Sequence, residues 1–536
     1  MTGSVRYLIL VLCLCAASCA VCGDEPPRPP VADVPSGPRD VELVAPPAET
    51  YAGRQRKTPF DKRVLGSLGQ LPENLQYDPC LARAAAEFAR HLQARPGGEI
   101  ELPDELQSVV LHHVGCTDGW VASHVFQSSS VADDDFVAHV RSVMANRLDT
   151  STHFGVGRAR AQPPMRWTWV LFASERHVTL SPLPRRVAAD SEVVIAGTLA
   201  PEMREPRVLI LAPGSAVEEA DLDLTEGRFR AVWKVLQPGE HWVEVLVTGP
   251  LGPRVAALFP VWVEIPPPTS VTIKAPEDER EVATEADAEA LMFRLLNEDR
   301  ARHGFPLLER DIRLDNIARG HSTDMRDAGY FAHVSPTKGT LDDRFAAQKY
   351  PSQASGENIA RNRSVHDAEM GLLQSLGHRE NILNAEFTHV GIGAAFSTDQ
   401  YERRTIYLTQ NFARPQRELT GKQFQAEVYK RLDAMRETKQ LFPLNRSDKL
   451  QRIAAARARE AENADGLSDR IRADLRAQHF RYRSFHIQTH VVLDPADVKI
   501  PDAARARKVR RVAVGAYPMR DASGRTRWST LLLLLE

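Results

Sequence analysis

The 536-residue chain is predicted to be a multidomain protein that combines α+β units with one all-β unit. At roughly 100–200 residues per domain, its length predicts three to five domains. Its hydrophobic fraction of 43% and charged fraction of 26% are ordinary for folded soluble domains. Helical and strand periodicities recur along the chain, except in residues 176–266, where strand patterns occur without helical ones.

The first residues have the pattern of an export signal. An apolar run at residues 7–15 follows a positive charge and is too short to span a membrane. Small residues ahead of Cys19 resemble a bacterial lipobox, in which this cysteine carries the lipid. The alternative is an ordinary secretory signal cleaved near Ala20 or Gly23. We expect a signal peptide at residues 1–22 and a protein outside the cytoplasm, lipid-anchored in the bacterial envelope or otherwise secreted.

Cysteine usage agrees with export. Four of the six cysteines lie in the leader, and only Cys80 and Cys116 lie in the body of the chain. Two cysteines suit one disulfide in an oxidising compartment, or they are two separate buried thiols.

Composition divides the following residues into a tether, two units and a linker. Residues 23–58 are rich in proline and charge and predict a disordered tether. Residues 59–175 carry mixed helix and strand patterns. Residues 176–266 contain short strand-like runs separated by turn signals, which predict an immunoglobulin-like β-sandwich acting as a spacer. Residues 267–287 begin with three prolines and read as a second linker.

Residues 288–415 combine helix signals with a strand pair. Ser364 begins a predicted helix with a capping box, and Gly377 is expected to end it. Alternating apolar residues at 390–396 and 406–412 predict two paired antiparallel strands.

This plan recurs along the chain. Phe305-Pro306-Leu307 returns as Phe442-Pro443-Leu444, and the strand at 389–393 has counterparts at 153–157 and 511–515. The irregular spacing indicates domain duplication rather than a solenoid. Three copies of one α/β unit are expected at residues 59–175, 288–415 and 420–536.

Three runs in the middle copy, at residues 330–336, 356–360 and 377–383, carry ionisable side chains beside a glycine, a proline or a helix start. These side chains are His333, Glu357 and His378, spaced 24 and 21 positions apart. Only a tertiary fold can bring residues at this spacing together. Imidazole and carboxylate are ligands that suit zinc, and a site of three protein ligands leaves one position open for water.

A family resemblance follows from these runs together with Leu296-Asn297, Phe305-Pro306-Leu307 and Val390-Gly391-Ile392-Gly393. Residues 288–415 resemble the bacterial branch of the CAP superfamily, whose SCP domains occur in cysteine-rich secretory, antigen-five and pathogenesis-related proteins. The resemblance implies an α-β-α sandwich with a central cleft. It also implies that the two outer copies are degenerate CAP-like domains.

Carried over by position, the resemblance makes His333, Glu357 and His378 the ligands of zinc or another divalent metal, and the catalytic groups if there is catalysis. The second glutamate of the family falls near Gln374 or Ser375, and neither is acidic. The expected cleft residues are His321, His333, Glu357, Asn358, Gln374, Ser375 and His378. Structural roles are the alternative: Glu357 fixing a turn, His333 capping one, and His378 binding helix-end carbonyls.

Two functions remain open at this point. The favoured one is a non-enzymatic module that binds a lipid, glycan or peptide of the cell envelope, because two copies lack the motifs and can persist only as interaction surfaces. It requires no cofactor. The alternative is a metal-dependent hydrolase or protease with Glu357 or a metal-bound water as base. A net charge of −2 with dispersed positive charge does not indicate a nucleic-acid partner.

Overall fold

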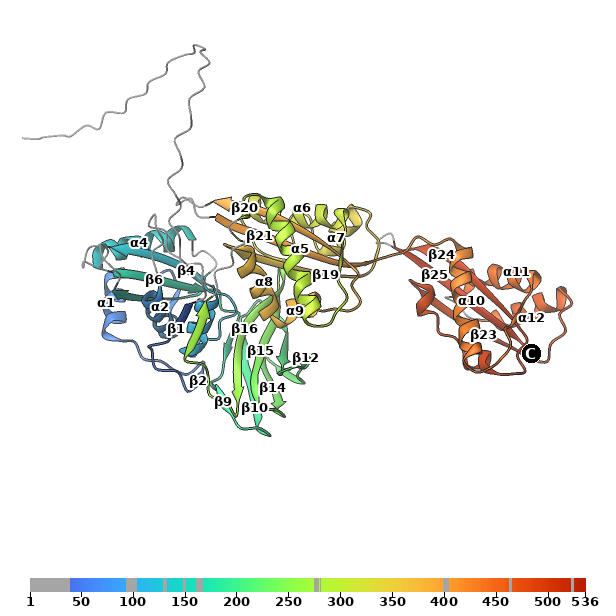
Figure 1. Cartoon of the computed structure of the whole chain (residues 1–536), viewed down its shortest axis with the longest axis horizontal. Helices are drawn as coiled ribbons and strands as arrows, with labels where there is room; N and C mark the ends of the chain where they lie inside the picture. Colours follow the sequence, from blue (N-terminus) through green and yellow to red (C-terminus); the bar gives the residue numbers. More distant parts are fainter. Residues whose placement is uncertain are drawn as a thin grey trace, which may run out of the picture.

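The computed structural model describes residues 39–92, 104–128, 133–147, 151–160, 167–273, 279, 281–398, 404–461, 465–521 and 525–536. These residues form three α/β units, each built around a four-stranded sheet, one unit of two packed sheets and two short two-stranded sheets (Figure 1). In the described part of the chain, no helix has both the length and the hydropathy to cross a membrane.

The first α/β unit has the sheet order β3-β5-β6-β4. Its elements are α1 (Pro59–Leu68), β3 (Gln76–Tyr77), α2 (Pro79–His91), α3 (Asp104–His113), β4 (Ala122–Ser128), α4 (Asp133–Arg147), β5 (His153–Arg160) and β6 (Trp167–Ser174).

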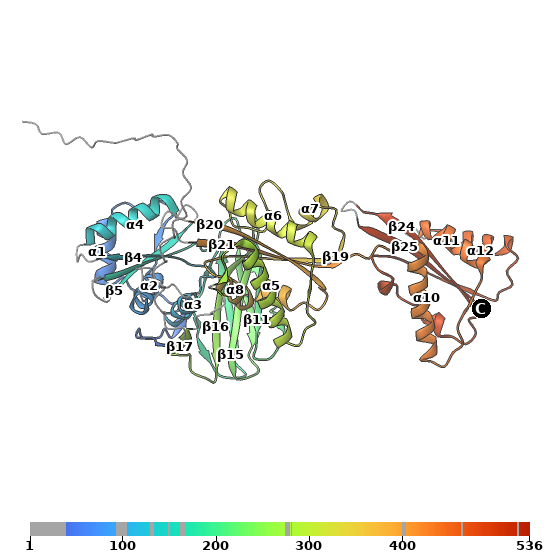
Figure 2. The ribbon, with the colours of Figure 1, turned by 45° about the horizontal axis from the view of Figure 1, so that its top comes forward.

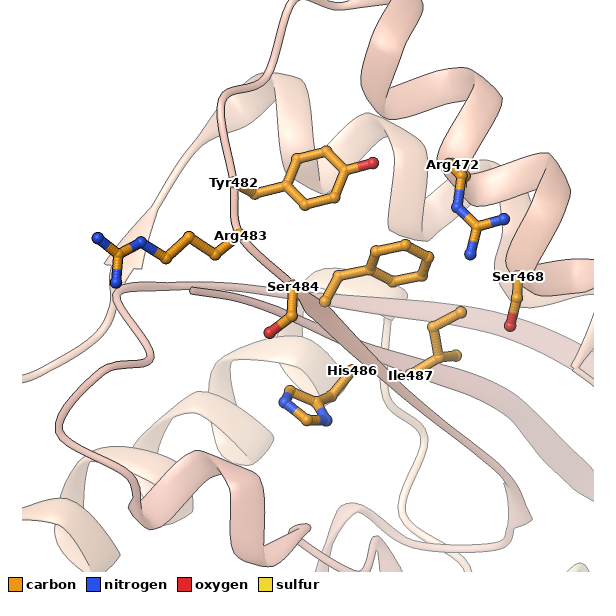
Figure 3. A pocket seen from close by; sticks show the side chains of 8 residues that line it. Ser468, Arg472, Tyr482, Arg483, Ser484, His486 and Ile487 are labelled. Atoms are coloured by element: carbon orange, nitrogen blue, oxygen red, sulfur yellow. The ribbon is translucent and has the colours of Figure 1, made fainter.

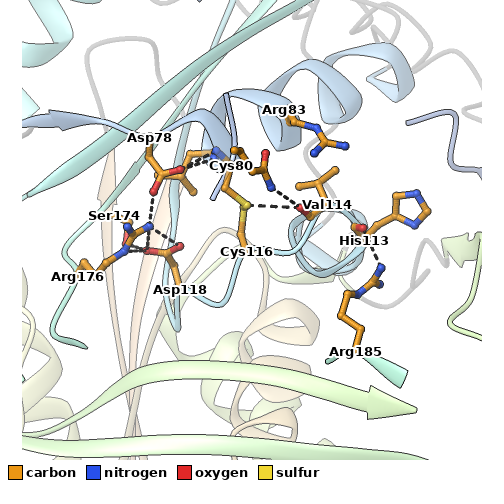
Figure 4. Close-up of a disulfide and its surroundings, with 12 residues drawn as sticks. Asp78, Cys80, Arg83, His113, Val114, Cys116, Asp118, Ser174, Arg176 and Arg185 are labelled. Atoms are coloured by element: carbon orange, nitrogen blue, oxygen red, sulfur yellow. Dashed lines mark hydrogen bonds and ion pairs between the residues drawn. A yellow bond between two sulfur atoms is a disulfide. The ribbon is translucent and has the colours of Figure 1, made fainter. Parts of the chain in front are cut away.

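A disulfide joins Cys80 at the start of α2 to Cys116 beyond α3, with Cα atoms 5.8 Å apart (Figure 4). Arg176 lies beside it and binds Asp78 at 2.7 Å and Asp118 at 3.1 Å. Of the two alternatives that the sequence left open, the structure has the bonded pair.

The two-sheet unit has the sheet orders β13-β14-β10-β7 and β12-β11-β15-β16-β9. Side chains of both sheets share one core, including Ile195 and Phe229 from the first and Val243 and Phe259 from the second. Its strands are β7 (Val178–Leu180), β8 (Leu183–Pro184), β9 (Arg186–Val187), β10 (Glu192–Leu199), β11 (Arg204–Leu211), β12 (Val217–Glu219), β13 (Leu222–Thr225), β14 (Arg228–Lys234), β15 (Gly239–Gly249) and β16 (Gly252–Val263).

The middle α/β unit has the sheet order β18-β20-β21-β19. Gly393 on β20 faces helix α6, and a Cβ at this position would overlap the backbone of Arg319, so a larger residue would push the helix away. The elements are α5 (Glu285–Arg302), β18 (Glu309–Arg310), α6 (Ile312–Ala328), α7 (Leu341–Ala347), β19 (Ser352–Asn362), α8 (Val365–Gln374), α9 (Leu376–Ile382), β20 (His389–Thr398) and β21 (Arg404–Pro415).

The C-terminal α/β unit stands at the far end of the molecule in both views (Figures 1 and 2). Its sheet order is β22-β24-β25-β23. The elements are α10 (Gly421–Glu437), β22 (Asn445–Arg446), α11 (Asp448–Arg457), η2 (Ala458–Glu460), α12 (Leu467–Ala477), β23 (Phe485–Val492), η3 (Pro495–Asp497), η4 (Asp502–Arg505), β24 (Arg511–Arg520) and β25 (Thr526–Leu535).

The three α/β units share one plan. In each, a short strand runs parallel to the first of two long antiparallel strands, and a further antiparallel strand pairs with the second. Each opening helix starts at a threonine that forms a capping box: Thr58, Thr284 and Thr420.

The prediction of a disordered tether needs correction at residues 39–58, and the predicted linker contains a paired strand at residues 270–273. Strand β1 (Arg39–Glu42) pairs with β17 (Ser270–Ile273), and β2 (Thr50–Tyr51) pairs with β8. Tyr51 is fully buried, with its ring 4.8 Å from that of Phe259. Burial of this large aromatic side chain favours an ordered segment here. The predicted signal peptide and Cys19 lie outside the described residues.

The predicted end of the helix that Ser364 begins is also wrong. Helix α8 ends at Gln374, and a second helix, α9, starts at Leu376 and runs through Gly377. The Glu244 carboxylate of the two-sheet unit accepts hydrogen bonds from the first backbone N–H groups of α9. This distant cap provides a helix start that local sequence does not reveal.

Candidate functional site

A cluster of polar side chains in the middle unit centres on Glu357 of β19. His333, in the loop after α6, places Nδ1 3.0 Å from Glu357 Oε1. His321 of α6 places Nε2 3.9 Å from the same oxygen. Arg344 of α7 donates to Glu357 Oε2. The fold therefore joins two predicted histidines to the predicted glutamate and adds an arginine that the sequence interpretation missed.

Arg344 ties the carboxylate to the surrounding loop. Its Nη1 also donates to the carbonyl oxygens of His333 at 3.0 Å and Gly339 at 2.9 Å. The Asn411 amide, with its nitrogen turned toward the site, donates to Glu357 Oε2 at 3.2 Å. Burial acts to raise the pKa of Glu357, but the hydrogen bond from His333 and the charges of His333 and Arg344 outweigh it and lower that pKa. Glu357 is thus an ionised, fully partnered carboxylate.

The imidazoles of His321 and His378 are neutral at neutral pH. Burial lowers the pKa of His321 to about 4, and burial together with His333 lowers the pKa of His378 to about 3. His321 Nε2 lies 3.0 Å from the Ala332 carbonyl oxygen, so this nitrogen carries the proton. The rings of His333 and His378 lie 6.3 Å apart, which brings the third predicted residue to the edge of the cluster.

Asn358 and its partners hold α9 against the sheet. Asn358 Nδ2 donates to the His378 carbonyl oxygen at 3.1 Å and to Gln410 Oε1 at 2.9 Å. Gln410 Nε2 donates to Glu369 Oε2 at 2.8 Å, and burial raises the pKa of Glu369 to about 8. Asn381 donates to Asn358 Oδ1 at 2.9 Å. Asn358 therefore positions His378 through the backbone.

Gln374 and Ser375 lie at the junction of α8 and α9, which faces the two-sheet unit. Glu244 of β15 accepts from the Leu376 N–H at 2.8 Å and the Gly377 N–H at 3.0 Å. Burial raises the pKa of Glu244 to about 7, against the hydrogen bonds from Gly377, Ser375 and Leu376 that lower it. An acidic group does reach this position, but from a residue 132 positions away.

The hairpin between β15 and β16 covers part of the cluster. The Val334 N–H donates to the Leu251 carbonyl oxygen at 3.1 Å. Gly252, with φ +104°, lies so close that a Cβ there would be 3.3 Å from His333 Cβ. The His333 side chain keeps 20% of its surface exposed. One rim of the cluster is thus occupied by the chain's own backbone.

The donor set does not fit a metal ion as it is arranged. Both carboxylate oxygens of Glu357 already face nitrogen donors, one of them the permanently charged Arg344 guanidinium. A cation placed there would meet that charge at close range. Among the described residues, no group of three or more His, Cys, Asp or Glu side chains is placed to hold a metal.

Comparison with known families agrees with this geometry. The model of the cysteine-rich secretory protein family, CAP, matches residues 293–412, which contain the whole cluster from His321 to Asn411. The middle unit is a CAP domain. The match covers only part of the chain and leaves the two-sheet unit and the outer α/β units outside it.

Two curated relatives come from Bacillus subtilis (strain 168). The chain is 39% identical over 140 residues to the uncharacterized membrane protein YlbC, and the match covers 26% of this chain and 38% of YlbC. It is 38% identical over 106 residues to the uncharacterized protein YkwD, which covers 20% of this chain and 41% of YkwD. The chain thus spans less than half the length of each relative.

Two solved structures are also similar. An extracellular protein containing an SCP domain from Bacillus anthracis str. Ames is 24% identical, covers 45% of this chain and 87% of its own, and has a TM-score of 0.22. An outer surface protein from Borrelia burgdorferi is 16% identical, covers 25% of this chain and 96% of its own, and has a TM-score of 0.22.

Proposed function

We propose that the CAP domain is a non-enzymatic binding module whose cleft, at His333 and His378, takes a peptide or another small ligand of the cell envelope. The ion pair of Glu357 with Arg344 is the observation that carries this proposal. A carboxylate held ionised by a guanidinium is a weak base, because general bases work best with a pKa near the operating pH. The neutral imidazoles remain as hydrogen-bonding groups for recognition.

The covering hairpin favours a peptide among the candidate ligands. Its Leu251 carbonyl oxygen accepts from the Val334 backbone, beside the exposed edge of His333. Main-chain hydrogen bonds of this kind are how grooves bind extended peptides. A peptide is therefore the ligand that we propose for this cleft.

The metal-dependent hydrolase has no observation in its favour. It requires His333, Glu357 and His378 to share one cation, whereas Glu357 is paired with Arg344. The binding function therefore remains the proposal for the CAP domain.

We also propose roles for the other units and a location for the protein. The outer α/β units are degenerate CAP-like copies, supported by the shared sheet order and threonine caps. The two-sheet unit is an immunoglobulin-like spacer, supported by its helix-free residues 176–263. The protein acts outside the cytoplasm, lipid-anchored through Cys19 or otherwise secreted. The export-type leader and the Cys80–Cys116 disulfide support that location.

The test is equilibrium binding of a fluorescent peptide library to the full chain, measured by anisotropy. We expect at least one peptide class to bind, and the His333→Ala/His378→Ala variant to bind it about tenfold or more weakly. The exposed His479→Ala in the C-terminal unit is the control and should bind as the wild type does. Equal affinity of the cleft variant and the wild type would remove the cleft from the proposal.

A further inference from the structure

The C-terminal α/β unit is strongly basic, although the chain as a whole is not. Residues 420–536 contain 24 Lys and Arg and 14 Asp and Glu, a formal net charge of +10, whereas the whole chain has −2. The remaining residues are therefore acidic on balance. A charge of one sign on one unit attracts polyanions of the opposite sign to that unit alone.

The end of this unit where β25 finishes lies away from the CAP domain (Figures 1 and 2), and the segments that meet there are rich in Lys and Arg. There β24 begins, β25 ends and β23 begins, so that Arg511, Leu535 and Phe485 lie side by side across the sheet. The segments that lead into these strands carry Arg483 and Arg510. We call this surface the basic end, formed by Arg472, Arg481, Arg483, Lys508, Arg510 and Arg511.

Several of these charges lack an acidic partner. Arg481, Arg483 and Arg510 are exposed, and within the described residues no carboxylate pairs with any of the three. Glu536 is bound instead by Lys508, with Nζ 2.8 Å from Oε1. Unpaired guanidinium groups are well suited to carboxylate and phosphate, which they bind through two parallel hydrogen bonds.

A pocket of about 520 Å³ opens at the basic end, where β23 starts and α12 passes (Figure 3). Two aromatic rings line it, those of Tyr482 and Phe485, with centroids 5.7 Å apart. The Arg472 guanidinium lies 5.7 Å from the Phe485 ring, and Ser468 faces it from the same helix. β23 is the outermost strand of its sheet, so some of its backbone polar groups are also free to bind.

We propose that the basic end binds an anionic polysaccharide, one whose sugars carry carboxylate or phosphate groups. The aromatic faces stack on sugar rings, the hydroxyl and edge-strand groups bind sugar hydroxyls, and the arginines pair with the acidic groups. A pocket of this volume is in the range that holds small ligands. This site is separate from the CAP cleft, and neither proposal depends on the other.

Two other polyanions fit the observations less well. A bilayer-inserting surface needs several protruding apolar side chains, and among the described residues of this unit only Phe442 is large, apolar and exposed. Most nucleic acid lies in the cytosol or nucleus, where disulfides are rare, whereas this chain has the Cys80–Cys116 disulfide.

The test compares full-chain variants by equilibrium binding to four probes: polygalacturonate, neutral dextran, single-stranded DNA and phosphatidylglycerol vesicles. The triple variant Arg481→Gln/Arg483→Gln/Arg510→Gln should bind polygalacturonate about tenfold more weakly than the wild type. The matched control Arg204→Gln/Arg228→Gln/Arg230→Gln removes the same charge from exposed arginines of the two-sheet unit and should bind within about twofold.

Other outcomes would overturn the proposed site or its ligand. Equal weakening by both triple variants would assign the effect to net charge and overturn the site. Equal binding of dextran would overturn the anionic requirement, and tighter arginine-dependent binding of DNA or vesicles would overturn the polysaccharide. Tyr482→Ala should weaken polygalacturonate binding without changing its salt dependence, because stacking is not screened. No effect of Tyr482→Ala would exclude the pocket.

Discussion

The CAP domain and the C-terminal unit share one sheet order, but they differ in the polarity of the side chains buried on one strand. Both bury one arginine that closes the loop after the first helix. Arg300 Nε donates to the Pro306 carbonyl oxygen at 2.7 Å, and Arg436 Nε donates to the Phe442 carbonyl oxygen at 2.7 Å. These loops are the Phe-Pro-Leu repeats of the sequence, so the repeats mark a shared structural device.

The interiors differ along one strand. Gly393 of the CAP domain pairs with Thr409, and Gly515 of the C-terminal unit pairs with Leu531. From this register, Thr409, Gln410 and Asn411 correspond to Leu531, Leu532 and Leu533, and all six are fully buried. Buried polar rows cost stability unless every group is satisfied. The CAP domain keeps such a row beside Glu357, whereas the C-terminal unit has three leucines at the corresponding positions.

The largest effect is expected from breaking the ion pair of Arg344 with Glu357 in the CAP domain. Arg344→Met leaves Glu357 buried without its cation and should lower the free energy of unfolding by about 3–5 kcal/mol. Urea denaturation of the full chain, followed by a probe in the CAP domain, measures this. Arg294→Met on the exposed face of α5 is the control, expected within about 0.5 kcal/mol. A similar small change for Arg344→Met would mean that the pair does not hold the site together.

Gly393 and Gly515 test whether the CAP domain and the C-terminal unit pack a helix against the sheet in the same way. Gly393→Ala and Gly515→Ala would each drive a Cβ into the facing helix backbone and should each cost about 3 kcal/mol. Gly320→Ala within α6 has open space around it and should stabilise by about 0.5–1 kcal/mol. Thermal denaturation compares the three. Tolerance of alanine at only one of the two strand positions would show that the two units pack differently.

The contact between the CAP domain and the two-sheet unit predicts a pH dependence. The pKa of Glu244 is raised to about 7 from an ordinary 4.5. The folded protein holds this proton more tightly than the unfolded chain, so stability falls as pH rises from about 4.5 to about 7. Glu244→Gln cannot ionise. Relative to this variant, the wild type should lose about 3 kcal/mol over that window.

Chemical denaturation of both proteins at several pH values measures the difference, in which other titrating groups cancel. The exposed Glu218→Gln on the same unit provides the control, with a difference that stays level. A level difference for Glu244→Gln as well would refute the buried cap.

The smallest effects are expected when the buried residues at corresponding positions of the two units, Gln410 and Leu532, are exchanged. Gln410→Leu removes one of the hydrogen bonds of Asn358 and the hydrogen bond that Glu369 accepts, and should cost about 1–3 kcal/mol despite the gain in apolar surface. Leu532→Gln places an unpartnered amide in the apolar core of the C-terminal unit and should cost a similar amount. Urea denaturation measures both. If either exchange were neutral, the polar row would not be specific to the CAP domain.

Local signals predicted much of the fold. Ser364 marked a helix start, and the alternation at 390–396 and 406–412 predicted the paired strands β20 and β21. The recurring strand at 153–157, 389–393 and 511–515 pointed to three sheets that prove to have one strand order. These features depend on caps and periodicities that a short stretch of sequence contains.

The site was only partly predictable, because several of its contacts join residues that lie far apart in the sequence. His333 and Glu357 were recognised from motif runs, and they do meet. Arg344 reaches Glu357 from a helix with no motif of its own, and Glu244 reaches α9 from another unit. No local pattern signals either contact. The charge of residues 420–536 was countable from the sequence, but their concentration at one end required the fold.

Product analysis by mass spectrometry tests directly whether the CAP cleft binds its ligand without catalysis. The full chain and its His333→Ala/His378→Ala variant are incubated with a peptide library, with and without added zinc. We predict identical product spectra for the two proteins in both conditions. Products formed by the wild type and absent from the variant would exclude purely non-catalytic binding and establish the cleft as an active site.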